Sequence, residues 1–190
     1  NMHIMKAESP GPSVSKLVPR VKTTALILYS IYFALTLIEF IMLLFGGMTV
    51  FEALTTSFAT AGTGGFGFYN SSMGSFSPYL QIVITVFMIL FAINFNCYYM
   101  LLCGKLREAF NLELRTFLII IASVITVITI NIHGMFSSVG EALRHSAFTV
   151  ASLISTTGFS TVDFNQWPEL SRALLVIIMF IGACAGSTGG

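Results

Sequence analysis

The sequence predicts an all-α membrane protein made of repeated hairpins, in which a re-entrant helix and an irregular loop lie between two spanning helices. Three observations support this fold class: an apolar composition, apolar runs of membrane-spanning length, and an internal repeat. Hydrophobic residues make up 55% of the 190 positions and charged residues only 9%, with a mean hydropathy of +0.87. Soluble domains carry about 25% charged residues. This chain therefore has too few charges to cover a surface that faces water.

Apolar runs divide the chain into four candidate membrane segments, residues 25–45, 80–103, 117–132 and 174–185. A straight spanning helix needs about 20 residues, so the first two runs are long enough alone. The third is long enough if it begins near Leu114, and the fourth only if its helix continues past the Gly-rich end. Because the chain stops just after an apolar run, we expect it to be an internal fragment of a longer protein.

Two shorter apolar segments, residues 49–61 and 138–155, each lead into a cluster of Gly, Thr and Ser. The first would cover about 20 Å as a helix, which is less than the roughly 30 Å of hydrocarbon in a bilayer. Such segments are either amphipathic helices at the membrane surface or re-entrant helices. The re-entrant interpretation is favoured because each segment lies between two spanning runs and ends in a Gly-containing strip.

The basic residues are distributed asymmetrically, which predicts the orientation in the membrane. Seven of the nine precede the first span or separate the second from the third: Lys6, Lys16, Arg20, Lys22, Lys105, Arg107 and Arg115. The loops near residues 46–48, 68–78, 133–140 and 161–168 contain no Lys or Arg. We therefore expect these loops outside the cell and the basic segments in the cytoplasm.

The chain contains an internal repeat at a spacing near ninety residues. Glu52-Ala53-Leu54 is matched by Glu141-Ala142-Leu143. Thr63-Gly64-Gly65, which we name the first strip, is matched by Thr156-Thr157-Gly158, the second strip, and Phe follows each strip.

The strips have the composition of a cation site inside a membrane. Irregular backbone at that depth is tolerated only where protein or a water-filled cavity satisfies its polar groups. Rows of carbonyl oxygens suit a dehydrated cation, and glycine allows consecutive carbonyls to turn to one side. The helix before each strip directs its negative end there, with Glu52 and Glu141 favourably placed in its first turn. A surface loop is the alternative for either copy alone, but two matched copies argue against it.

These stretches resemble a known family. Residues 6–12 (KAESPGP) and 58–67 (FATAGTGGFG) are similar to the second pore repeat of the Trk/Ktr/HKT potassium-transporter superfamily, Trk type. Residues 154–168 (ISTTGFSTVDFNQWP) resemble its third filter, and residues 180–190 (FIGACAGSTGG) the break in the following helix. The resemblance covers nearly the whole chain and implies potassium-channel-like repeats of helix, re-entrant pore helix, filter loop and helix. Four such hairpins would surround one pore, with the second and most of the third present here.

The resemblance implies a division of the chain into a cytoplasmic connecting segment at 1–22, a first pore repeat at 23–104, a cytoplasmic linker at 105–113 and a second, truncated repeat at 114–190. It implies potassium uptake across the cell (inner) membrane by a multi-pass, pore-forming subunit, with K⁺ as the transported ion and no organic cofactor in this chain. The implied partners are a second copy in a homodimer, a cytosolic nucleotide-binding regulatory ring, and membrane lipid.

The resemblance also assigns roles to individual residues. It implies K⁺ coordination by the backbone carbonyls of Thr63, Gly64, Gly65, Thr156, Thr157 and Gly158. It implies a flexible gate below them made of Gly186, Ser187, Thr188, Gly189 and Gly190. Both filter glycines are present, which fits potassium preference, although a Na⁺-permeable relative stays open because selectivity also depends on other repeats. Gly74, in an outer polar loop, should tolerate substitution without a change in ion selectivity.

Other functions fit the sequence less well. Residues 62–67 formally match the dinucleotide pattern G-x-G-x-x-G but lack the strand before it and the helix after it. A net charge of +1 argues against nucleic acid. No nucleophile and base at enzyme-like spacing occur, so an enzyme is not expected. A membrane anchor or assembly subunit without transport remains the alternative.

A few polar residues and cysteines lie inside or beside the apolar runs. Glu39 lies within a span; we favour a buried carboxylate that accepts hydrogen bonds from the re-entrant segment over direct ion contact. Asn94 and Asn96 are expected to bond between helices. The histidines are expected at the outer surface or at helix starts: His133 and His145. The cysteines are expected to be small buried residues: Cys97, Cys103 and Cys184. Residues 182–186 (GACAG) could be a packing motif or a helix break, and the break is favoured.

Overall fold

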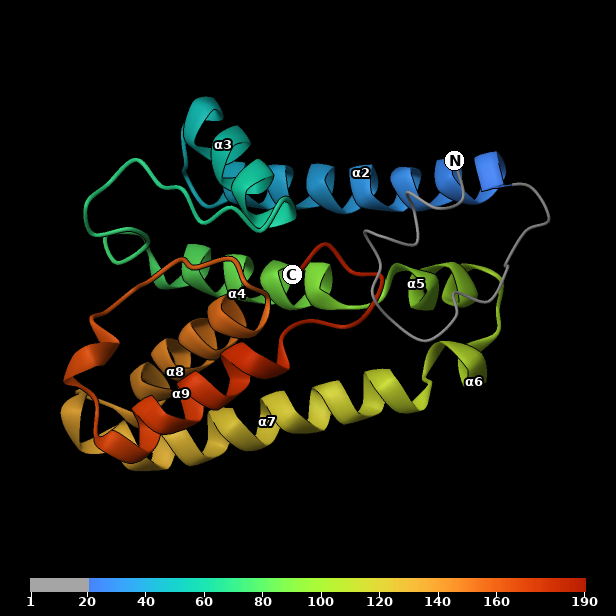
Figure 1. The fold of residues 1–190 in the computed structure, drawn as a ribbon. Coiled ribbons are helices and arrows are strands. Elements are labelled where there is room, and N and C mark those ends of the chain that lie inside the picture. Colours follow the sequence, from blue (N-terminus) through green and yellow to red (C-terminus); the bar gives the residue numbers. More distant parts are fainter. Residues whose placement is uncertain (1–20) are drawn as a thin grey trace.

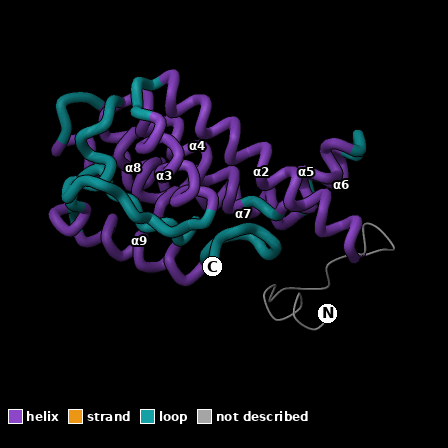
Figure 2. Tube along the Cα trace, turned by 90° about the horizontal axis from the view of Figure 1, so that it is seen from above, coloured by secondary structure: helices purple, strands orange, loops and turns teal. Residues whose placement is uncertain are grey.

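The computed structural model describes residues 21–190 and contains only helices and loops over that range (Figure 1, Figure 2). Apart from its last two residues, the expected connecting segment at 1–22 lies outside the described residues. The helices are α2 (Val21–Phe45), α3 (Val50–Ala61), α4 (Pro78–Ala92), α5 (Phe95–Leu102), α6 (Leu106–Ala109), α7 (Leu112–Ile132), the 3₁₀ turn η1 (His133–Met135), α8 (Val139–Ile154), the 3₁₀ turn η2 (Phe164–Gln166) and α9 (Glu169–Ile181). The all-α prediction is confirmed for this part of the chain.

Two hairpins of the expected kind, α2–α3–α4 and α7–α8–α9, make up most of the structure. The helices α2 and α7, of 25 and 21 residues, are long and apolar enough to cross a membrane. The helices α3 and α8 have 12 and 16 residues, which corresponds to only about 18 and 24 Å. In Figure 1, α2 and α7 lie on opposite sides of the molecule with α4 between them. The short helices are therefore too short to cross a bilayer alone, which fits the re-entrant interpretation.

Similar caps fix where α3 and α8 begin. The Thr49 hydroxyl accepts the N–H of Glu52, whose carboxylate accepts the N–H of Thr49 at 2.9 Å. At α8 the Ser138 hydroxyl accepts the N–H of Glu141 at 3.1 Å, and the Glu141 carboxylate accepts the N–H and hydroxyl of Ser137. Each carboxylate also lies at the positive end of its helix. Because the starts are fixed, the depth at which each helix ends is fixed as well.

The second apolar run, residues 80–103, is not the single straight span that its length predicts. It consists of α4 and α5, which meet at an angle of 90°. Ile93 is extended, with φ −82° and ψ 145°, and the side chain of Asn94 begins α5 by accepting an N–H from its first turn. The bend leaves the carbonyls of Phe91 and Ala92 without helical partners. Their new partners come from the far end of the chain, which apolar periodicity cannot reveal.

The two hairpins meet along a seam between α4 and α8. Both helices contribute fully buried side chains to one apolar cluster, including Phe91 of α4 and Phe148 and Ala151 of α8. Small residues at such contacts let helices approach closely, and in a bilayer close packing replaces removal from water as the stabilising term. The seam therefore holds the ends of α3 and α8 in one region of the molecule.

The bend also changes the environment of one cysteine. Cys97 and Cys184 are buried as expected, but Cys103 is exposed. It follows the last residue of α5, beyond the turn in direction, instead of lying inside a straight span. The expectation of burial was therefore wrong for Cys103.

The hairpin arrangement predicts the side from which individual loops are accessible. In full-length protein without native cysteines, cysteines at Ser71 and Asn165, both exposed in loops that follow the strips, should react with an impermeant maleimide added outside. A cysteine at Glu108, in the basic segment between the hairpins, should react only from inside. Labelling of positions 71 and 108 from the same side of the membrane would contradict the hairpin topology.

Candidate functional site

Both strips adopt the same unusual backbone conformation. The first strip has φ of +49° at Thr63 and +66° at Gly65, and the second has +61° at Thr156 and +87° at Gly158. In each strip the residue between these two has a negative φ. Positive φ is uncommon outside glycine, and here a threonine adopts it at the same place in both repeats. Alternating signs of φ turn successive peptide planes in a way that ordinary extended chain does not.

The N–H groups of the first strip are bonded to the helix that it follows. The N–H of Thr63 donates to the carbonyl of Thr60 at 3.1 Å, and the N–H of Gly64 donates to the carbonyl of Ala59 at 2.7 Å. These acceptors are among the last carbonyls of α3, which have no intrahelical partner. The strip and the helix end therefore satisfy each other.

The second strip repeats this pattern on α8. The N–H of Thr156 donates to Leu153, and those of Thr157 and Gly158 donate to Ser152, at 3.0 to 3.2 Å. Every strip N–H except that of Gly65 thus bonds to the preceding helix, while the acceptors stay free. Within residues 21–190, no backbone N–H bonds to the carbonyl oxygens of Thr63, Gly64, Gly65, Thr156, Thr157 and Gly158.

The two strips are neighbours in space. A Cβ atom added to Gly65 would collide with the carbonyl oxygen of Thr157 and lie 3.3 Å from the carbonyl carbon of Gly158. Glycine is therefore required at position 65 both by its φ and by the close approach of the second strip. At Gly158 an added Cβ would meet nothing within 4 Å, so its positive φ is the only constraint there.

The Gly-rich segment, residues 182–190, lies directly against the strips. Helix α9 stops before Gly182, which has φ of +67°, so residues 182–186 form a helix break and not a packing motif. The Thr63 hydroxyl donates to the carbonyl of Thr188 at 3.4 Å, and the N–H of Gly190 donates to the Thr156 hydroxyl at 2.9 Å. In Figure 1 this segment (red) runs back past the junction of α4 and α5.

The bend in α4 and α5 supplies the acceptors that hold the Gly-rich segment. The N–H and the hydroxyl of Thr188 both donate to the carbonyl of Phe91, at 3.2 and 3.1 Å, and the N–H of Cys184 donates to the carbonyl of Ala92 at 3.0 Å. These are the two carbonyls that the bend releases from α4. The bend and the Gly-rich segment are therefore mutually dependent.

Glu113, in the first turn of α7, fastens the other side of the segment. Its Oε1 accepts the N–H of Ala185 at 2.8 Å, and its Oε2 accepts the Asn94 amide at 3.4 Å. This contact confirms interhelical bonding for Asn94, whereas the amide oxygen of Asn96 has no partner among the described residues. One carboxylate thus joins the start of α7, the bend and the Gly-rich segment.

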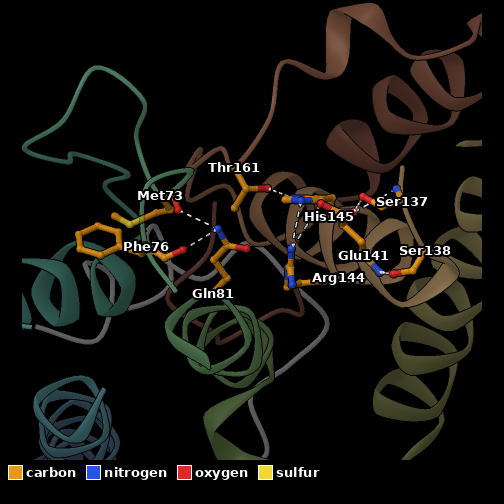
Figure 3. A network of polar contacts seen from close by, with 9 residues as sticks. All are labelled: Met73, Phe76, Gln81, Ser137, Ser138, Glu141, Arg144, His145 and Thr161. Carbon is orange, nitrogen blue, oxygen red and sulfur yellow. Dashed lines mark hydrogen bonds and ion pairs between the residues drawn. The ribbon is translucent and has the colours of Figure 1, made fainter. Parts of the chain in front are cut away.

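A loop of the first hairpin is bonded to the continuation of the second strip. The N–H of Met73 donates to the carbonyl of Ser160 at 2.8 Å, and the Ser72 hydroxyl accepts the N–H of Ser160 at 3.2 Å. The buried amide of Gln81, on α4, donates to the carbonyls of Met73 and Phe76 at 3.1 and 3.2 Å (Figure 3). The loop therefore connects α4 of one hairpin to the strip of the other.

This loop also contains Gly74, whose surroundings make it a poor control for selectivity. A Cβ atom at Gly74 would lie 2.7 Å from the carbonyl oxygen of Thr161, so the position is packed against the second hairpin. Gly134, in η1, has nothing within 4 Å of an added Cβ and no positive φ. It is the unconstrained outer glycine that Gly74 was expected to be.

Asp163 places a negative charge beside the outer continuation of the second strip. Its carboxylate accepts the backbone N–H of Asn165 at 3.1 Å, the Asn165 amide at 2.9 Å and the Gln166 amide at 3.3 Å. These bonds, the backbone one foremost, hold the pKa of Asp163 below its ordinary value. The group is therefore ionised at neutral pH and attracts cations to this face.

Glu39 and the histidines differ in part from their expected roles. Glu39 is fully buried, which fits a structural role, but its carboxylate oxygens have no hydrogen-bond partner among the described residues. The hydroxyl of Thr60 in the re-entrant helix donates to the carbonyl of Thr56 instead. His133 is exposed as expected, whereas His145 is buried within α8, so the surface interpretation was wrong for His145.

Comparison with known proteins identifies the family. Residues 2–190 match the TrkH family, described as a cation transport protein. The chain belongs to this family. The family resemblance seen in the strips is thereby confirmed. The chain has apolar helices long enough to span a membrane and belongs to a family of cation transport proteins. It is therefore part of an integral membrane transport protein and not of an enzyme.

TrkH-family relatives align along the whole chain. It is 35% identical over 195 residues to the Trk system potassium uptake protein TrkH of Escherichia coli (strain K12), covering all of this chain and 40% of that protein. It is 32% identical to TrkG of the same organism. The crystal structure of the potassium transporter TrkH from Vibrio parahaemolyticus superposes with a TM-score of 0.84 at 33% identity, covering 93% of this chain and 39% of that one. The chain thus spans about two fifths of the length of these relatives.

The structure brings together every residue that the sequence singled out as a site. The two strips adjoin each other. In the Gly-rich segment, Thr188 contacts the first strip and Gly190 contacts the second. Glu113, Gln81 and His145 were not recognised as part of this assembly. Their partners are backbone groups and side chains of other elements, so no local pattern in the sequence points to them.

Proposed function

We propose that the two hairpins form part of the ion path of a Trk-type potassium uptake protein in the cell (inner) membrane, with K⁺ as the transported ion. One observation carries the proposal: five of the six strip residues, all but Gly65, donate their N–H to the end of the preceding helix, while no described backbone N–H bonds to a strip carbonyl. A dehydrated K⁺ ion needs such free, inward-facing carbonyls in place of its hydration shell. The relatives TrkH and TrkG of Escherichia coli are potassium uptake proteins, which supports potassium over other cations.

In this proposal each strip supplies one side of a shared filter. The contact between Gly65 and Thr157 brings the two sides to the distance at which one ion could bind both. The negative ends of α3 and α8 point toward the same place. The proposed ligands are the backbone carbonyls of Thr63, Gly64, Gly65, Thr156, Thr157 and Gly158.

The Gly-rich segment is proposed as the gate below this filter. It contacts the hydroxyls of Thr63 and Thr156 on one side and Glu113 on the other. The start of α7, which carries Glu113, lies at the expected cytoplasmic end, so the segment would separate the strips from the cytoplasm. The gate residues are Gly186, Ser187, Thr188, Gly189 and Gly190.

The same proposal includes the division into domains and the binding partners. We propose pore repeats at 23–104 and 114–190 joined by a cytoplasmic linker at 105–113, with the segment at 1–22 also cytoplasmic. Large apolar side chains remain exposed on the outer helices, such as Phe33 and Phe180 at 67% and 88%. They suit contact with lipid, with further repeats or with a second copy in a homodimer. Lys105 and Arg107 are exposed at the inner side, where a cytosolic nucleotide-binding regulatory ring would act.

Replacement of a strip glycine should lower potassium selectivity. Serine at Gly158 places a side chain on a residue with φ of +87°, which turns its carbonyl away. We expect Gly158→Ser, in full-length protein in proteoliposomes, to lower the K⁺/Na⁺ uptake ratio by about tenfold, since roughly 1.4 kcal/mol of lost preference suffices. Gly158→Ser is sharper than Gly65→Ser because position 65 also lacks room.

The matched control is Gly134→Ser, on a glycine with open space, which should leave the ratio unchanged. An unaltered ratio in both Gly158→Ser and Gly65→Ser would mean that the strips are not the filter. A wild-type ratio near one would favour the Na⁺-permeable alternative, and absence of flux in intact protein would favour the anchor alternative.

Release of the Gly-rich segment should increase flux and weaken regulation. Glu113→Ala removes the acceptor for Ala185 and Asn94, so the segment loses its cytoplasmic attachment. We expect higher basal K⁺ uptake and a response to the regulatory subunit that is reduced by about fivefold or more. Deletion of residues 187–189 should act in the same direction.

The control for this experiment is Glu108→Ala, which removes only an exposed ion pair with Lys105 and should change neither quantity. If both Glu113→Ala and the deletion keep the full response to the regulatory subunit, the segment is not the gate.

A further inference from the structure

His145 is a buried polar side chain that the proposed ion path does not use. It lies in the second turn of α8 and is 7% exposed. Its Nδ1 lies 2.8 Å from the hydroxyl of Thr161, and its ring stacks on Phe136 with centroids 5.1 Å apart. Thr161 is buried as well and follows Gly158 by three residues. The imidazole therefore ties the outer continuation of the second strip to the helix behind it (Figure 3).

The neighbour of His145 favours the tautomer with the proton on Nδ1. Nη2 of Arg144 lies 3.5 Å from Nε2 of His145. A guanidinium can only donate, so Nε2 is the acceptor in this contact. The imidazole is then neutral, with its proton on Nδ1, and donates to the Thr161 hydroxyl. This arrangement requires a neutral His145.

Arg144 lies between the Glu141 carboxylate and the Gln81 side chain. Its Nη2 lies 4.0 Å from the Glu141 carboxylate, which is anchored to Ser137. In Figure 3 the amide oxygen of Gln81 is turned toward Arg144, and that oxygen and Nε of Arg144 are both buried without partners among the described residues. Since Gln81 also holds the loop that clasps Ser160, the second strip is fixed both from α4 and from α8.

The first repeat makes an equivalent tie with different chemistry. Tyr69, six residues after Thr63, donates its hydroxyl to the carboxylate of Glu52 at 2.6 Å. That carboxylate is fixed in the capping box of α3, so the loop after the first strip is also fastened to its pore helix. Both strips are thus held at their outer continuation by a side-chain bond to the short helix. In the second repeat the bond depends on an imidazole.

We propose that His145 is a positioning residue for the second strip, which acts through Thr161 to hold the strip carbonyls at the spacing that favours K⁺ over Na⁺. The proposal rests on the function proposed above for the strips. Loss of the tie leaves the ligands in place but lets them approach a smaller ion, so selectivity falls while transport persists. A residue that only stabilised the fold would change the amount of protein and not this ratio.

The geometry also makes selectivity sensitive to external pH. The charged groups that face His145 are Arg144 and Glu141, both on α8, while Gln81 and Thr161 from the other elements are uncharged. Protonation of Nε2 would turn a donor and a positive charge toward the Arg144 guanidinium. The acceptor is then lost and Arg144 is repelled. Acidification should therefore lower the K⁺/Na⁺ ratio of the wild-type protein.

The test compares variants of the two bonded side chains in full-length protein in proteoliposomes. His145→Leu and Thr161→Val should each lower the K⁺/Na⁺ uptake ratio by about three- to tenfold, and the double variant should lower it no further, because both remove the same bond. Thr161→Ser keeps the hydroxyl and should retain the ratio. His145→Asn keeps a donor near the position of Nδ1 and should restore most of it.

A pH profile separates this role from a purely structural one. Because burial lowers the pKa of His145 below its ordinary value, the wild-type ratio should fall as the outside pH drops below about 6. The ratio of His145→Asn should stay flat because its amide does not titrate. Gel filtration of each variant reports whether it is folded. A ratio within twofold of wild type in Thr161→Val, an additive double variant, or a pH profile shared by wild type and His145→Asn would each overturn the proposal.

The Gly158→Ser variant distinguishes failure of the filter assignment from failure of the positioning role of His145. If Gly158→Ser lowers the ratio and the variants of His145 and Thr161 do not, the strips are the filter and the positioning role is wrong. If Gly158→Ser leaves the ratio unchanged, the filter assignment itself fails.

Discussion

Backbone that leaves a helix inside a membrane must find partners for its polar groups within the protein, and the structure follows from how that requirement is met. The helices α3 and α8, of 12 and 16 residues, are too short to cross the roughly 30 Å of hydrocarbon in a bilayer. Their last carbonyls accept the N–H groups of the strips that follow. The carbonyls of the same strip residues accept no N–H from the described backbone. The constraint that removes N–H groups from the membrane interior therefore also produces a row of unpaired acceptors, which is what a dehydrated cation requires.

The same requirement joins the strips to the rest of the molecule. The bend after α4 releases the carbonyls of Phe91 and Ala92, and the Gly-rich segment supplies their donors. That segment in turn touches the hydroxyls of Thr63 and Thr156. The proposed filter, the proposed gate and the bent helix consequently form one hydrogen-bonded unit. Glu113 accepts the N–H of Ala185. A movement of Glu113 can therefore be transmitted to the strips through the Gly-rich segment alone.

The sequence predicts most of the fold because the signals are local. Apolar length identifies α2 and α7, and the repeated Glu and Gly positions identify the short helices and the strips. It fails at residues 80–103 because the bend at Ile93 is stabilised by Cys184 and Thr188, about ninety residues away. The packing of Gly74 against Thr161 depends on how the hairpins meet, and the burial of His145 depends on how the loop after the second strip folds back onto α8. Cys103 was expected to be buried because the bend was not foreseen.

The central claim is that the carbonyls of both strips coordinate the same ions. Its most direct test is a structure of the full-length protein soaked with Tl⁺ or Rb⁺, which substitute for K⁺ and are located by anomalous scattering. The account predicts anomalous peaks between the first and second strips, at coordination distance from the carbonyls of residues 63–65 and 156–158, and weaker peaks when Na⁺ competes. Well-ordered strips with no peak between them, and peaks elsewhere along the path, would contradict it.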